Sequence, residues 1–220
     1  MSGSTFGCAK SVLVFVVILF TLVAVQPAGA VAFPWDNPNG GNSDFSWANG
    51  GSEYGRFGSP HLDTGNTLIF SPISFEAVSL DGESVSVSDK LEFEASSGYG
   101  FQTILITESG DYEIEEAGTV SASGTLWVEN LDTSVILSEP LSFTLLLTES
   151  TWQGSAQVSI APTDWTYIKV TFENELSATA ADGSVASIEN TASDIKIQVP
   201  EPATIGLLTL GSLVFIGKKK

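Results

Sequence analysis

The chain has 220 residues, a formal net charge of −18 and one cysteine. Such an acidic balance argues against nucleic acid and anionic membrane surfaces as partners, because like charges repel. Cys8 lies near the N-terminus, so the rest of the chain has no disulfide and its fold depends on a hydrophobic core alone.

Residues 1–30 have the pattern of a secretory signal peptide. A polar stretch with Lys10 leads into the apolar run Val12–Phe20, and Ala28-Gly29-Ala30 supplies the small residues that a signal peptidase accepts. We expect cleavage after Ala30, with Ala28 and Ala30 as the recognised residues and with Ala30-Val31-Ala32 as the second choice of site. The alternative is a retained anchor, but the apolar stretch is only about 22 Å long as a helix, short of a hydrocarbon core of roughly 30 Å.

Residues 31–198 form the mature body, which is strongly acidic. It has 25 Asp and Glu residues against four basic ones, so its formal charge is near −21. About 170 residues is the size of one domain with a substantial core. The charge favours divalent cations or basic partners, and it also keeps a protein without disulfides in solution, which is the simpler explanation.

An aromatic segment rich in glycine and asparagine, residues 33–66, begins the body. Trp35, Trp47, Tyr54 and Phe57 could form a platform that stacks on the apolar faces of pyranose sugars, while Asn and Asp side chains bond the sugar hydroxyls. The alternative is that these rings close one end of the core, as large aromatic side chains usually do. The segment therefore predicts either a carbohydrate-binding surface or a group of buried rings that closes one end of the core.

The loop Asp36–Asp44 is the densest group of oxygen-bearing side chains in this segment. Calcium is the ion that such a loop would suit best. The loop does not match the twelve-residue EF-hand pattern, however, and turn formation alone explains its composition. We therefore predict no bound cofactor, with calcium as the one ion to test.

Side chains for metal-dependent or nucleophilic catalysis are scarce. His61, in a Gly-Ser-Pro loop, is the sole histidine, and the body has no cysteine. A zinc site and a nucleophilic triad both need more ligands or bases than this inventory supplies. We predict no metal site and no catalytic triad.

From Thr67 onward, short segments alternate apolar and polar side chains with a period of two, which is typical of half-buried strands. The clearest are Leu91–Ala95, Tyr112–Ile114, Val120–Ala122, Leu126–Val128, Ile168–Phe172 and Ile195–Val199. Turns are expected at Asp81-Gly82, Ser97-Gly98, Ser109-Gly110-Asp111 and Asp182-Gly183.

Two continuous apolar runs, Ile104–Ile106 and Leu145–Leu147, predict strands covered on both faces, or helix edges. Roughly ten to twelve strands with frequent turns predict an all-β fold. We expect a single β-sandwich domain, with the jelly roll as one form that it could take, flanked by an N-terminal signal-peptide helix and a short apolar C-terminal helix.

Several strands carry pairs of glutamates with one residue between them. Glu92 and Glu94 are about 6.7 Å apart by strand rise, within the range used by inverting glycoside hydrolases. Glu113 with Glu115, and Glu173 with Glu175, repeat the spacing. The alternating apolar neighbours already explain these pairs as the solvent face of each strand. We predict that the protein is not an enzyme, with a secreted glycoside hydrolase as the weaker alternative.

Residues 199–220 end the chain in three ordered parts. Val199-Pro200-Glu201-Pro202-Ala203-Thr204 is followed by the apolar run Ile205–Gly217 and then by Lys218-Lys219-Lys220. The run is about 20 Å long as a transmembrane helix, too short for a comfortable permanent span. The lysines hold that end in the cytoplasm. The prolines around Glu201 prevent helix and strand and keep the peptide extended and accessible.

This arrangement resembles the PEP-CTERM protein-sorting signal of Gram-negative bacteria. It covers about a tenth of the chain and has lysines where the family often has arginines. The resemblance implies recognition by an integral-membrane exosortase, removal of the tail, and delivery to the cell surface or the exopolysaccharide matrix of a biofilm. The implied partners are signal peptidase and exosortase during export, the inner membrane transiently, and exopolysaccharide after delivery.

The two ends and the body together predict an exported structural or interaction protein of the cell surface or extracellular matrix, with transient C-terminal membrane anchoring. A carbohydrate-binding module that uses Trp35, Trp47 and Tyr54 is the alternative in the class of binding proteins.

Overall fold

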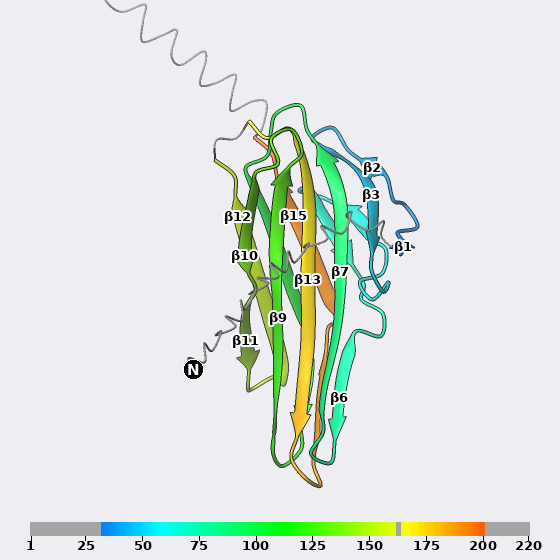
Figure 1. Cartoon of the computed structure of the whole chain (residues 1–220), viewed down its shortest axis with the longest axis vertical. Helices are drawn as coiled ribbons and strands as arrows, with labels where there is room; N and C mark the ends of the chain where they lie inside the picture. The colour runs from blue at the N-terminus through cyan, green and yellow to red at the C-terminus, as the bar shows by residue number, and fades with distance from the viewer. Residues whose placement is uncertain (1–31, 162–163, 201–220) are drawn as a thin grey trace, which may run out of the picture.

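The computed structural model describes residues 32–161 and 164–200, which form strands and loops only. The chain forms two antiparallel sheets packed into an elongated sandwich (Figure 1). The predicted all-β sandwich is therefore confirmed, whereas its jelly-roll form stays a prediction. Both terminal helices that we predicted, and the sorting residues from Glu201 to Lys220, lie outside the described residues. Within those described, no helix is long and apolar enough to cross a membrane.

One layer, the β13 sheet, has the strand order β1-β3-β7-β13-β9-β10, with β2 paired to β3. Its strands are β1 (Phe33–Pro34), β2 (Gly40–Gly41), β3 (Ser46–Ser52), β7 (Ser84–Ser96), β9 (Gly118–Asn130), β10 (Ile136–Pro140) and β13 (Tyr167–Ala180). The long strand β13 lies between β7 and β9, and it pairs with each over almost its whole length.

The other layer, the β8 sheet, has the order β11-β12-β8-β15-β5-β4, with β14 on β8 and β6 on β14. Its strands are β4 (His61–Asp63), β5 (Thr67–Phe70), β6 (Glu76–Leu80), β8 (Thr103–Ile114), β11 (Ser142–Leu146), β12 (Thr151–Ser159), β14 (Val185–Glu189) and β15 (Ala192–Gln198). The last strand, β15, lies inside this sheet, between β8 and β5.

The period-two pattern of the sequence determines which side chains enter the core. In β7, Leu91 and Phe93 are fully buried, whereas Glu92 and Glu94 alternate with them on the outer face. Aromatic rings fill the space between the layers, and Phe57 makes edge-on contacts with Phe70, Phe75 and Phe172. Burying a Phe side chain stabilises a fold by about 1.5–3 kcal/mol, so these rings contribute strongly.

The predicted turn at Ser109-Gly110-Asp111 is wrong, because these residues lie inside β8. A glycine is required at position 110 because the backbone of Glu189 approaches it closely, and not because the chain turns there. β14 and β15 pair with successive parts of the same edge of β8, and this pairing is interrupted at Glu189–Thr191. A Cβ atom on Gly110 would lie 1.8 Å from the carbonyl oxygen of Glu189. The Trp152 indole donates a 2.8 Å hydrogen bond to that oxygen, which satisfies it where pairing is interrupted.

Other differences from the prediction concern short and continuous segments. The described residues hold more strands than the ten to twelve expected, because β1, β2 and β4 have only two or three residues and no readable period. Ile104–Ile106 lies in β8 with alternating burial. Leu145 and Leu146 end the edge strand β11 and Leu147 is 79% exposed. Neither run is a helix edge, and neither is covered on both faces.

Candidate functional site

The rings predicted for sugar stacking do not form one surface. Trp35 is 3% exposed, Trp47 is 8% exposed and Phe57 is fully buried. Trp35 packs edge-on against Phe70 at 5.4 Å between ring centroids, inside the core. Tyr54 alone faces solvent, at 54% exposure, and its neighbour Glu53 raises the pKa of its hydroxyl. These tryptophans therefore close the core, and only Tyr54 is available to a ligand.

Asp89 fixes the loop that carries Tyr54. This buried carboxylate on β7 accepts hydrogen bonds from the backbone N–H groups of Tyr54 at 2.9 Å, Arg56 at 2.7 Å and Phe57 at 3.3 Å. A carboxylate satisfied by several backbone donors is a structural anchor with little remaining capacity for a ligand.

The oxygen-rich loop Asp36–Asp44 bonds to itself and to its neighbour. The Asn42 side-chain carbonyl accepts the backbone N–H of Asp44 at 2.8 Å, and the Asn42 amide donates to Asn66 at 2.7 Å. Asn66 in turn donates to the Asp44 carboxylate at 2.9 Å. Within the described residues no group of three His, Cys, Asp or Glu side chains is arranged to hold a metal ion.

The glutamate pair on β7 is engaged by neighbouring strands. Glu92 forms an ion pair with Lys169 of β13, with 3.0 Å between carboxylate oxygen and Nζ. Glu94 accepts a hydrogen bond from the Tyr167 hydroxyl and raises the pKa of that hydroxyl. Glu173 and Glu175 lie exposed on β13, and Glu113 on β8. His61 is exposed on the edge strand β4.

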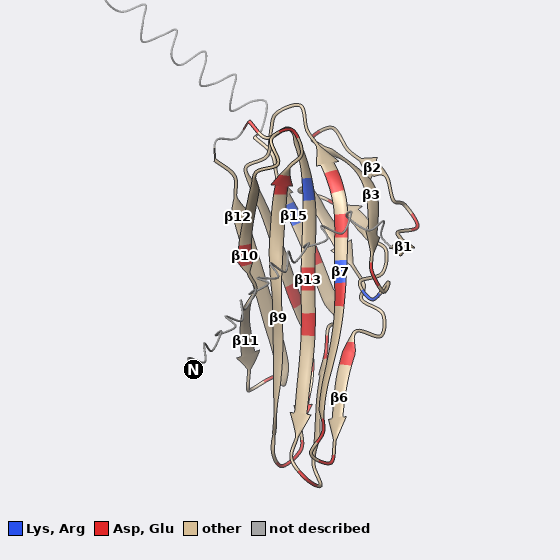
Figure 2. Ribbon diagram, in the orientation of Figure 1, with Lys and Arg blue, Asp and Glu red and all other residues tan. Residues whose placement is uncertain are grey.

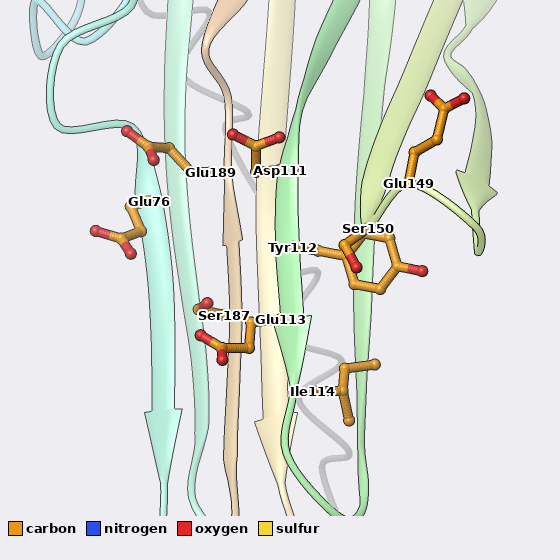
Figure 3. A pocket seen from close by; sticks show the side chains of 9 residues that line it. All are labelled: Glu76, Asp111, Tyr112, Glu113, Ile114, Glu149, Ser150, Ser187 and Glu189. Carbon is orange, nitrogen blue, oxygen red and sulfur yellow. The ribbon is translucent and has the colours of Figure 1, made fainter.

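An acidic groove of about 590 Å³ lies where β6, β14 and β8 adjoin (Figure 3). Its carboxylates are Glu76, Asp111, Glu113, Glu149 and Glu189. Pairing places Glu189 directly opposite Glu76 across β14 and β6. On the other side of β14, Ile188 pairs with Tyr112 of β8, and the adjacent Asp111 lies near Glu189, so three carboxylates form a row on one outer face (Figure 3).

Like charges placed opposite each other on a sheet are destabilising, so this row lowers stability. No Lys, Arg or His is among the residues that line the groove. Acidic residues also occur along most of the sandwich, with few basic ones between them (Figure 2). The acidic groove therefore attracts cations and basic groups, although its side chains do not form a compact metal-binding set among the described residues.

A second carboxylate site lies inside the sandwich. Glu108 of β8 is buried and accepts hydrogen bonds from Asn174 and Asn190, each at 2.7 Å, and from the Ser193 hydroxyl at 3.2 Å. Desolvation raises the pKa of Glu108 to about 8, and these three hydrogen bonds oppose the rise. Glu108 and Ser193 come from the β8 sheet and Asn174 from the β13 sheet, so this cluster joins the layers.

Sequence reasoning missed two of these features. The acidic groove depends on cross-strand register, which the sequence alone does not give. Glu108 follows the apolar run Ile104–Ile106 at an inward-facing position, and that alternation was a usable signal.

The fold and the C-terminal sequence define a class, an exported β-sandwich protein with a C-terminal sorting signal. A model of the PEP-CTERM protein-sorting motif matches residues 198–220, so the predicted resemblance is confirmed. The motif implies export, processing by an exosortase, and anchoring at the cell surface.

Two further comparisons address the whole chain. No curated protein matches the chain in sequence. Among solved structures, TmCBM61 in complex with β-1,4-galactotriose is similar over 76% of this chain and 99% of that chain, with 14% identity and a TM-score of 0.32. A likeness at this TM-score carries no argument about function.

Proposed function

We propose that this protein is a non-enzymatic structural or interaction protein of the cell surface or of the extracellular polysaccharide matrix. The observation that carries the proposal is the sorting motif at residues 198–220, which follows the body without a spacer domain. Gln198 is the last residue of β15 and the first residue of the matched motif. The sandwich is thus the cargo that the motif delivers.

The surroundings of the candidate acids support a non-enzymatic role. Glu92 is held in an ion pair and Glu94 in a hydrogen bond with Tyr167, so both carboxylates of the strongest hydrolase candidate have structural partners. Exposed carboxylates on the outer faces keep the body hydrated without disulfides. A dispersed negative charge on a rigid sandwich suits a protein that stays in solution at a surface or within a hydrated matrix.

Carbohydrate binding by the N-terminal segment remains a weaker proposal with a reduced set of residues. Of Trp35, Trp47 and Tyr54, only Tyr54 offers its ring to solvent. One exposed ring on a loop gives little stacking area by itself. Loss of glycan binding in Tyr54→Ala, with binding kept in a variant of another exposed residue that leaves the core intact, supports this proposal. Unchanged binding in Tyr54→Ala excludes it.

Processing at both ends is the direct test. Mass spectrometry of the protein from surface and medium fractions should find an N-terminus at Val31 and a C-terminus near Pro200. Glu201→Ala should retain the tail through Lys220 and move the protein to the membrane fraction, whereas the control Glu189→Ala should be processed normally. An intact Lys218–Lys220 tail in the wild-type surface and medium protein would refute the proposal.

A further inference from the structure

β11 is an edge strand of the β8 sheet, and one of its two sides has no partner strand. Its residues, Ser142–Leu146, pair with β12 alone within the described structure. In Figure 1, β11 lies at the margin of the sandwich, and no described strand lies beyond it. Alternate N–H and C=O groups of an edge strand point away from its sheet, so they are available to bond a further strand.

The other edge strands within residues 32–161 and 164–200 have features that hinder such pairing. β1, β2 and β4 have only two or three residues each. β6 contains Glu76, and β10 contains Glu139 and Pro140. Short length, charge and proline each make an edge a poor template for an added strand. β11 has five residues and contains neither a charged residue nor a proline.

The segment Leu141–Leu147 is uncharged and mostly apolar, in a body whose formal charge is near −21. Phe143 and Leu145 pack against the core but are only half-buried, and Leu147 is 79% exposed. The Phe143 ring lies 5.8 Å from the buried Trp152 ring, measured between centroids. A strand added at this edge would remove more of these side chains from water, so it would gain apolar burial as well as hydrogen bonds.

The order of side chains in this segment suits pairing with an identical segment. When two copies pair antiparallel about Thr144, Phe143 of each copy lies opposite Leu145 of the other. Leu141 then lies opposite Leu147, so apolar side chains meet apolar side chains. Such a two-fold contact uses the same surface on both copies and closes after two of them. The uncharged segment also lets two acidic bodies meet where neither carries a charge.

We propose that β11 pairs with β11 of a second copy of this chain, so that two β8 sheets join edge to edge. Five paired residues make a small contact, so the dimer is weak and reversible. In the two-fold register Glu139 of one copy approaches Glu149 of the other, and their repulsion weakens the contact at low salt. A foreign strand with basic flanks would instead bind best at low salt. The pairing is a property of the folded body and goes beyond the proposed delivery.

Single cysteines test this pairing, because Cys8 is the sole cysteine of the chain. In the purified full chain with Cys8→Ser, Thr144→Cys should form disulfide-linked dimers. Opposite residues of an antiparallel pair have Cα atoms about 4.5–5.5 Å apart, within the reach of a disulfide. Gln153→Cys is the matched control, because Gln153 is exposed and lies directly opposite Thr144 on β12. Its counterpart would be three strand spacings away, roughly 14 Å, which is too far for a disulfide.

Sedimentation equilibrium measures the association without a cross-link. The Cys8→Ser chain should form more dimer at high salt than at low salt, because screening reduces the repulsion between two acidic copies. Thr144→Glu should weaken the association about tenfold, since two like charges then face each other across the pair. Gln153→Glu adds the same charge one strand further in and should associate nearly as before. The apolar run Ile205–Gly217 is common to all variants, so a difference between these two positions belongs to β11.

The proposal is overturned if Thr144→Cys forms no more dimer than Gln153→Cys, or if Thr144→Glu associates as Gln153→Glu does. Association that weakens as salt rises also contradicts it. Cross-linking of Thr144→Cys to a different protein in the surface fraction would replace the second copy with a foreign strand. Normal removal of the tail without dimers contradicts the β11 pairing alone, whereas dimers with an intact tail contradict the proposed delivery alone.

Discussion

Glu108 of β8 accepts a 2.7 Å hydrogen bond from the side-chain amide of Asn174 on β13, which joins the two sheets through their interior. The Asn174 side-chain carbonyl has no partner within the described residues. A protonated Glu108 could donate to that carbonyl if the amide is turned over, because Asn oxygen and nitrogen positions are assigned from hydrogen bonding. The pair thus supports either protonation state of the carboxyl.

The pH dependence of stability should reveal this carboxyl. The pKa of Glu108 is raised from 4.5 to about 8 in the folded chain. Between these values the folded state binds more protons than the unfolded state, so stability decreases as pH rises. The contribution is fully present below about pH 4.5 and is lost as pH passes about 8, with a total on the order of 5 kcal/mol.

Glu108→Gln removes that titration while keeping the size and polarity of the side chain. Between about pH 4.5 and 8, the urea concentration at the unfolding midpoint should fall more for wild type than for Glu108→Gln, because the variant lacks the titration of Glu108. Glu139→Gln, on the exposed edge strand β10, is the matched control and should follow the wild type. Parallel pH profiles for wild type and Glu108→Gln would contradict the prediction.

Asp89→Ala should destabilise the loop that carries Tyr54. The backbone donors of Tyr54 and Arg56 lose their acceptor, at a cost of about 3 kcal/mol in the free energy of unfolding. Thermal unfolding monitored by circular dichroism gives the measurement. Asp111→Ala, an exposed carboxylate of the acidic groove, should leave the melting temperature nearly unchanged, and an equal loss in both variants would argue against a specific anchor.

Gly110→Ala should prevent folding or lower stability severely. A Cβ atom would meet the Glu189 carbonyl at 1.8 Å, and that backbone cannot move without breaking the contact with Trp152. Gly98→Ala is the control, because nothing lies within 4 Å of a Cβ placed there. Yields of folded protein and melting temperatures of the two variants decide the matter, and equal behaviour would show that the sheet can adjust.

Glu189→Gln should stabilise the protein slightly. It removes the middle charge of the row that includes Glu76 and Asp111, which relieves repulsion by about 0.5–1 kcal/mol at low salt. The gain should shrink at high salt, because exposed charges are screened. Denaturant unfolding at two salt concentrations measures it. A loss of stability would mean that the row has a compensating partner.

The alternation of side chains predicted the layered fold well. Segments such as Leu91–Ala95 and Ile168–Phe172 lie in long strands with the expected inner and outer faces. Local pattern suffices there because burial on one face of a sheet is itself a period-two property. The sorting motif was equally readable, because an ordered sequence of residue types defines it without tertiary structure.

Features that depend on pairing between distant strands were not predictable. The sequence Ser109-Gly110-Asp111 has the composition of a turn, and only the approach of Glu189 explains why a glycine interrupts β8. Trp35 and Trp47 lie in a polar, glycine-rich segment that resembles a surface, yet tertiary packing buries them. The acidic groove collects residues of β6, β8 and β14, whose proximity follows from register.

β15 connects the body to the sorting motif from inside a sheet, where β8 and β5 hold it on both sides. Hydrogen bonds between antiparallel strands run perpendicular to the strands. Tension applied at Val199 therefore loads both rows of bonds at once, in shear, and cannot peel an edge strand away one bond at a time. A sandwich fastened by this end resists being pulled open by flow or by cell movement, which favours its C-terminal strand as a mechanical attachment point.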